Sequence, residues 1–148
     1  MLMNIAVQIN ESSLSLSYGN LITGEIYFQI GSHCFPGRTW NDFVDVILRW
    51  WVQSFIKLTG EVAEECEFLF MDGPFLARAV RVGSDKLSMQ FVERGETERV
   101  VLSATGNLHS FKDSIVTASN RIIQIAESRC WDSKDIDELK AVVKSIAG

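Results

Sequence analysis

Residues 40–58 read WNDFVDVILRWWVQSFIKL, and this stretch decides the fold that the sequence predicts. Its apolar side chains recur at the spacing of an α-helix, and its polar ones fall on one narrow stripe: Asp42, Asp45, Arg49, Gln53 and Lys57. We expect Thr39 to cap this helix at its N-terminus, and Asp45 to pair with Arg49 one turn later. An apolar arc this broad is typical of a helix that is covered on more than one side, either under a curved sheet or also against a partner.

The segments before this helix are predicted to be β-strands. Apolar and polar residues alternate most clearly over residues 24–30, and weaker strand patterns cover residues 4–9 and 13–18. Between the strands and the helix, Phe35-Pro36-Gly37-Arg38 favours a type II turn, in which proline fixes the second position and glycine supplies the positive φ of the third.

The segments after the helix predict an antiparallel meander followed by two more helices. Turn sequences separate four short strand patterns: residues 66–71, 75–82, 86–92 and 99–102. Amphipathic patterns then predict helices over about 108–130 and 133–147. Because strands and helices are segregated along the chain, we expect a single α+β domain over residues 1–148. Its antiparallel sheet of about six or seven strands would pack against the long apolar helix and the two C-terminal helices.

The charge of the chain is concentrated in one window. The 148 residues carry a formal net charge of −5, and this acidic balance argues against a dedicated nucleic-acid binder. Residues 61–72 contain five acids and no base, so they hold the whole excess: Glu61, Glu64, Glu65, Glu67 and Asp72. Such a patch can steer and specify a basic protein partner, although similar runs also occur as solvated loops that keep a protein soluble.

Neither the N-terminus nor the apolar stretches indicate export or a membrane span. Residues 1–10 contain no Lys or Arg, and charged residues interrupt the most apolar stretch, residues 43–58. Three cysteines without paired spacing favour reduced thiols over a disulfide framework. We therefore expect a cytoplasmic protein with no membrane contact.

No constellation in the sequence predicts catalysis. His33, Cys34 and the distant His109 could form a Cys–His pair, but no orienting Asn or Asp is marked. The cysteines and histidines lack the spacing of a zinc site, and the ten glycines form no phosphate-binding motif. We predict a protein that is not an enzyme and has no cofactor and no metal.

Two further features are candidates for contact with a partner. Trp50 lies at the margin of the apolar arc, whereas Trp40 and Trp51 lie within it and are assigned to the core. Phe70-Met71-Asp72-Gly73-Pro74 combines a hairpin signal with a proline that lacks the N–H needed to close the turn. This turn is either a binding edge or an ordinary bulged turn.

The pattern WxDFxxxILxWW, formed by residues 40–51, and the FMDGP sequence at residues 70–74 resemble a loosely defined group of small bacterial proteins. Several small acidic proteins of this kind look like immunity proteins of polymorphic-toxin or contact-dependent inhibition systems. The resemblance covers about residues 22–82 and brings no catalytic residues with it. It implies a role in binding a toxin.

The leading hypothesis is an immunity protein that binds and neutralises a cognate toxin domain, such as a basic nuclease, through an acidic surface. The predicted contact residues are Glu61, Glu64, Glu65, Glu67, Asp72 and Trp50. One alternative is a small-ligand-binding or enzymatic domain with a pocket between the sheet and the helix of residues 40–58. That alternative requires a deep cavity containing His33, Cys34 or His109. Another is an assembly module that forms a homodimer through a strand edge or the Trp50 side of the helix.

Overall fold

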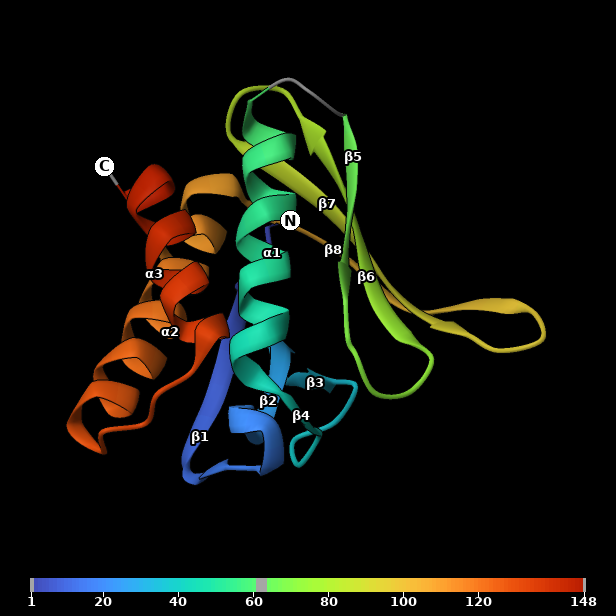
Figure 1. Cartoon of the computed structure of the whole chain (residues 1–148). Coiled ribbons are helices and arrows are strands. Elements are labelled where there is room, and N and C mark those ends of the chain that lie inside the picture. Colours follow the sequence, from blue (N-terminus) through green and yellow to red (C-terminus); the bar gives the residue numbers. More distant parts are fainter. Residues whose placement is uncertain (1, 61–63, 148) are drawn as a thin grey trace.

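The computed structural model describes residues 2–60 and 64–147 and has the predicted α+β architecture (Figure 1). Within these residues, eight strands form two antiparallel sheets of four strands each, and three α-helices pack against them. The fold class is therefore confirmed. The single sheet expected from the sequence is instead divided into two, with the first long helix between them.

The first sheet is built around β2 (Ile22–Ile30). On one side β2 pairs with β1 (Ile5–Leu16), which joins the two strands expected at residues 4–9 and 13–18 into one, with a shift of register between Asn10 and Ser15. On its other side β2 pairs with two short strands that the sequence did not predict, β3 (His33–Phe35) and β4 (Asn41–Phe43). A short 3₁₀ turn at Tyr18–Asn20 connects β1 to β2.

The second sheet is the predicted meander. Its strands are β5 (Glu65–Leu69), β6 (Phe75–Val82), β7 (Lys86–Arg94) and β8 (Glu98–Asn107), and they pair in this order. Figure 1 shows the β7–β8 hairpin projecting well beyond the rest of the molecule. One face of this sheet therefore covers the core, and the end of the hairpin extends into solvent.

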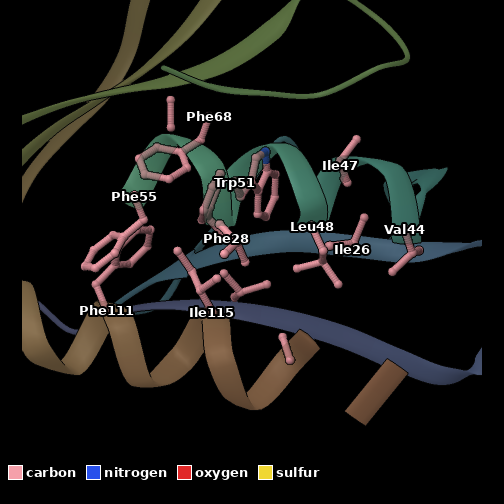
Figure 2. Packing of buried hydrophobic residues seen from close by; sticks show 14 of the residues in the cluster. Ile26, Phe28, Val44, Ile47, Leu48, Trp51, Phe55, Phe68, Phe111 and Ile115 are labelled. Atoms are coloured by element: carbon pink, nitrogen blue, oxygen red, sulfur yellow. The ribbon is translucent and has the colours of Figure 1, made fainter. Parts of the chain in front are cut away.

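Helix α1 (Val44–Thr59) lies between the two sheets, and α2 (Leu108–Ser128) and α3 (Lys134–Ala147) cover its remaining sides (Figure 1). The ring of Trp51 stacks on that of Phe28 from β2, with centroids 4.5 Å apart. In Figure 2, Phe55 lies between Phe68 of β5 and Phe111 of α2. The prediction that α1 is covered on more than one side is confirmed. Each such buried ring contributes roughly 1.5–3 kcal/mol to folding.

None of the helices within residues 2–60 and 64–147 is long and apolar enough to cross a membrane.

The predicted start of α1 is wrong by four residues. The helix begins at Val44, and Thr39 does not cap it, because residues 41–43 pair with β2 as strand β4. Tertiary strand pairing here overrides the local helix signal. The type II turn is also wrong, since Gly37 does not take the positive φ that its third position requires.

The polar stripe expected on α1 is only partly a solvent-facing stripe. Asp45 is 0% exposed, and its carboxylate accepts hydrogen bonds from the backbone N–H groups of Ile22 and Val46 and from Ser133 Oγ. It does not pair with Arg49, which instead forms ion pairs with two acids of α3, Asp135 and Glu138, at 3.3 and 3.1 Å. Burial raises the pKa of Asp45, although these hydrogen bonds oppose the rise.

Asp42 joins the first sheet to the turn that precedes β6. It is 2% exposed, and its carboxylate accepts hydrogen bonds from Trp40 Nε1, from its neighbour's N–H and from the backbone N–H of Asp72. Trp40 lies against Gly73, where a Cβ would come within 2.6 Å of the indole ring. Gly73 also has a φ of +74°, so the turn requires glycine on two grounds. The FMDGP sequence is thus anchored to the first sheet by Asp42.

Candidate protein-binding site

The second sheet has one face turned toward α1 and one turned toward solvent, which we call the outer face. Along each strand the side chains alternate between the two faces, and the cross-strand neighbours Phe68, Ala77 and Phe91 lie on the core side. The adjacent cross-strand pair, Glu67 and Arg78, lies on the outer face. Most residues of the candidate site lie on the outer face.

Five charged side chains form a charge cluster across the outer face: Glu65, Glu67, Arg78, Arg94 and Glu98. Arg78 lies at its centre and contacts all three carboxylates, at 3.2 Å for Glu65, 3.3 Å for Glu67 and 2.8 Å for Glu98. Arg94 Nη2 lies 2.9 Å from the Glu67 carboxylate and reaches Glu98 as well. The hydrogen bonds from Arg78 lower the pKa of Glu98, so this carboxylate stays ionised at neutral pH.

The sequence predicted an acidic surface at residues 61–72, but the charge cluster shows that arginines neutralise part of its charge. Three carboxylates face two guanidinium groups, which leaves a local excess of one negative charge. The two arginines come from β6 and β7, outside the acidic window of residues 61–72. The outer face therefore presents a fixed array of both signs with a small negative excess, and its far field is weaker than the sequence indicated.

Aliphatic side chains surround the charge cluster. Among the described residues, large hydrophobic side chains between 38% and 48% exposed gather on the second sheet and its β5–β6 turn: Leu69, Met71, Val80, Val82, Val100 and Val101. The register aligns Leu69, Leu76, Val92 and Val100 in one row across the outer face. The ends of this row are exposed, whereas Leu76 and Val92 in its middle are 3% and 0% exposed. The ion pair between Arg94 and Glu67 spans this middle section, because the two residues lie on opposite sides of the row.

A groove continues the outer face around the edge of β5. It has a volume of about 270 Å³ and lies between α1 and β5, where it is lined by Trp50, Gln53, Ser54, Lys57, Glu67 and Leu69. Two hydrogen bonds fix its walls, from Ser54 Oγ to the Glu67 carbonyl and from Trp51 Nε1 to the Leu69 carbonyl. Trp50 is partly buried beside it. We call this hollow the Trp50 groove.

The structure brings together some of the residues predicted to contact a partner. Trp50 and Glu67 line the same groove, and Glu65 belongs to the charge cluster. Glu64 is exposed just before β5. Glu61 lies outside the described residues. Asp72 does not join the others, because it lies in the turn beyond Leu69, at the opposite end of β5 from Glu65.

The residues that sequence reasoning missed are the arginines and the exposed aliphatic side chains. Alternation along residues 75–82 places Leu76, Arg78 and Val80 on one side of β6, so their shared face was readable from the sequence. The strand that lies opposite β6 could not be predicted, because the pairing of Arg78 with Glu67 depends on a register that local patterns do not specify.

The residues considered for catalysis do not form a common site. His33 and Cys34 lie on β3 in the first sheet, whereas His109 begins α2 after the second. Burial and the neighbouring Glu65 and Glu67 raise the pKa of Cys66 to about 12, so this thiol is protonated at neutral pH. In residues 2–60 and 64–147, no cluster of three or more His, Cys, Asp or Glu side chains could hold a metal ion. The alternative hypothesis placed a ligand pocket between the sheet and α1. The interface between α1 and β2 is filled by side chains such as Phe28 and Trp51, whereas His109 lines a separate cavity at the end of α1.

Comparison of the chain with protein-family models, with curated proteins and with solved structures found no match. The resemblance to immunity proteins therefore stays a prediction, and the outer face and the Trp50 groove are the candidate surfaces for a function.

Proposed function

We propose that this chain is an immunity protein, which neutralises a cognate bacterial toxin domain by binding it with the outer face and the Trp50 groove. The observation that carries the proposal is the set of exposed aliphatic side chains around the charge cluster, represented by Leu69, Val80 and Val100. Exposed apolar groups gathered on one face with charged groups among them are typical of protein interaction sites. Such an inhibitor acts without chemistry of its own, in the cytoplasm that it protects.

Each part of the surface has a distinct task in this proposal. Leu69, Val80 and Val100 supply apolar area, and Trp50 supplies an aromatic side chain of the type that often dominates binding energy. The carboxylates of the charge cluster are held in place by Arg78 before a partner arrives, so little ordering entropy is lost on binding. Their negative excess favours a partner with basic groups, such as a nuclease domain.

The size of the outer face indicates that the proposed interface extends beyond it. Four strands about 4.8 Å apart and eight residues of about 3.3 Å rise each give a face on the order of 500 Å². A stable interface buries about 800 Å² on each partner, so the outer face alone is too small. The Trp50 groove adjoins the face through Glu67 and Leu69, so we expect a partner to cover both.

The proposal is tested by co-expression with a toxic protein encoded next to this chain. We expect the chain to restore growth and to bind that protein in titration calorimetry. The double variant Leu69→Asp, Val80→Asp should weaken binding at least tenfold and abolish protection. The matched control is Leu16→Asp, at an exposed leucine of β1 in the first sheet. A non-toxic neighbour, or equal loss in the control, would contradict the proposal.

The electrostatic part of the proposal has a separate test. Glu64 is exposed and forms no ion pair with another described residue, so Glu64→Lys changes the charge while leaving the charge cluster intact. We expect it to lower the association rate and to flatten its dependence on salt, with little change in the dissociation rate. Stopped-flow binding at two salt concentrations measures both, and an unchanged association rate would remove the electrostatic role.

A further inference from the structure

A second hollow lies away from the outer face, where the end of α1, the β6–β7 turn, the start of α2 and the end of α3 meet. Its volume is about 340 Å³, at the small end of the range of ligand sites in proteins. No residue of the charge cluster or of the exposed aliphatic set lines it. An inference drawn from this cavity is therefore independent of the proposed function.

The charged side chains that line this cavity are all basic. Arg81 of β6 and His109 and Lys112 of α2 contribute to its wall, and no Asp or Glu among the described residues does so. In a chain of 19 acids and 14 bases, this is an unusual concentration of positive charge. Within residues 2–60 and 64–147, neither Arg81 nor Lys112 forms an ion pair.

The guanidinium of Arg81 is held in place while part of it stays available. Its Nε donates to the Gly83 carbonyl at 3.2 Å, and its Nη1 donates to the Thr59 carbonyl at 3.3 Å. These contacts fix the plane of the group, and no described residue accepts a hydrogen bond from Nη2. Preorganisation of this kind lowers the entropy cost of binding an anion.

The two basic residues of α2 that line the cavity lie near the N-terminus of this helix. They lie in the first two turns, where the unpaired N–H groups already create positive potential, and the first turn contains no acid. The positive potential of this helix end adds to the charge of Lys112, so this wall of the cavity favours an anion.

The rest of the wall is apolar or carries hydroxyl groups. Phe55, Leu108 and Ile146 provide an apolar side, and Ser84 and Ser145 stand at the rim with side chains that can donate or accept. A ligand matched to this wall carries an anionic head and a small apolar body. A dianionic head is favoured over a carboxylate, because two permanent cations and an imidazole line the same cavity.

From this arrangement we propose that the cavity binds a small phosphate monoester. Its phosphate group lies among Arg81, His109 and Lys112, and its apolar part lies against Phe55, Leu108 and Ile146. The proposal involves binding alone and no covalent step.

The test uses phenyl phosphate as the probe, with inorganic phosphate, benzoate and phenol for comparison. The chain has two histidines, so the imidazole NMR signals of His109 report on the cavity and those of His33 serve as an internal control. We expect phenyl phosphate to shift the His109 signals in a saturable manner while His33 stays unchanged. Its Kd should be at least tenfold lower than that of each of the three comparison compounds.

A matched pair of variants completes the test. Lys112→Gln should raise the Kd of phenyl phosphate about tenfold, whereas Lys134→Gln removes the same charge at the other end of α3 and should have no effect. Equal effects of the two variants, or shifts that do not saturate, would overturn the proposal. Benzoate binding as tightly as phenyl phosphate would overturn the assignment to a phosphate ester.

Discussion

The two sheets have the same number of strands but differ in the face that each turns to solvent. On the first sheet, the side chains that alternate with the buried ones are polar: Gln8, Asn10, Glu25, Tyr27 and Gln29. On the second sheet, the corresponding face carries Leu69, Val80 and Val100 around the charge cluster. Among the described residues, the first sheet exposes one large aliphatic side chain, Leu16 at the end of β1, whereas several gather on the second sheet. This gathered set is the surface that we propose binds a partner.

The two sheets also differ in how far their edge strands are covered. The edge of β1 is closed by α2, because Ser114 Oγ accepts the Val7 N–H at 2.7 Å and Arg121 pairs with Glu11. The edge of β8 meets the first sheet only near its end, through the hydrogen bond from Met3 N to the Thr105 carbonyl. Most of β8 from Glu98 to Ser103 is exposed. An open strand edge of this kind is a site where another chain can add a strand.

The largest expected change in the free energy of unfolding comes from a core position of the first sheet, compared with an outer position of the second. Phe28→Ala should lower the free energy of unfolding by about 3–5 kcal/mol, because it removes a ring that stacks on Trp51 and leaves a cavity. Val80→Thr on the outer face should change it by less than about 0.5 kcal/mol. Urea unfolding measures both. Similar losses in the two variants would mean that Val80 belongs to the core.

The next effect concerns the buried carboxylate that joins the first sheet to α3. Asp45→Ala should lower the free energy of unfolding by about 2–3 kcal/mol, because the N–H of Ile22 and the hydroxyl of Ser133 lose a buried acceptor. Asp45→Asn keeps one carbonyl acceptor and should cost less. Equal costs in urea unfolding would show that the hydrogen bonds of Asp45 do not matter.

Two carboxylates, that of Asp45 in α1 and that of Glu98 in β8, should make contributions to stability that depend on pH in opposite directions. Burial raises the pKa of Asp45, so its contribution to stability is complete below the unfolded pKa and is lost as pH rises through the folded pKa. The hydrogen bond from Arg78 lowers the pKa of Glu98, so its contribution is present above the unfolded pKa and is lost as pH falls through the folded pKa. Unfolding measured from about pH 3 to pH 7 separates them. Asp45→Asn should remove the loss on raising pH, and Arg78→Gln should remove part of the loss on lowering it.

A smaller effect separates the closed edge from the open one. Ser114→Ala should cost about 1 kcal/mol, because the N–H of Val7 then loses its acceptor. Val101→Thr at the exposed edge of β8 should leave stability nearly unchanged. If the edge of β8 pairs with a second copy of the chain, sedimentation should show a dimer that Val101→Lys dissociates. A wild-type monomer at all concentrations would exclude that pairing.

The smallest expected effect lies in the charge cluster. Arg78→Gln should lower the free energy of unfolding by less than about 1 kcal/mol at low salt, because its partners on the outer face are largely exposed. The loss should shrink further as salt is added. A larger loss that does not depend on salt would mean that the cluster holds the second sheet together, and its role in binding a partner would then need other support.

The sequence predicted the features that depend on local patterns. Alternation and turn residues predicted the β5–β8 meander, and helical spacing predicted α2 and α3 close to their observed bounds. Local patterns failed where distant contacts decide. Asp45 was expected to pair with Arg49, because nothing near it in the sequence indicates its contact with Ser133, which lies 88 residues further along the chain.

The candidate site was predicted only in part, because its contacts depend on how distant elements pair. Trp50 and Glu67 were predicted separately from helical and charge patterns, and the structure brings them to one groove. The compensation of Glu67 by Arg78 and Arg94 could not be foreseen, since it depends on the register of three strands. A charge count along the chain says how much charge is present, and only strand pairing says how much of it is neutralised.

The connectivity of the two sheets has a consequence for how the chain folds. Every pair within the β5–β8 meander joins neighbours in sequence, and β2 pairs only with strands that precede or follow it closely. Pairing of this kind closes short loops, so both sheets are expected to nucleate early. The packing of α1 against α3 and the bond from Met3 to Thr105 span much longer separations. We expect the slow step of folding to be the enclosure of α1, and variants at its buried face should slow folding more than variants in either hairpin.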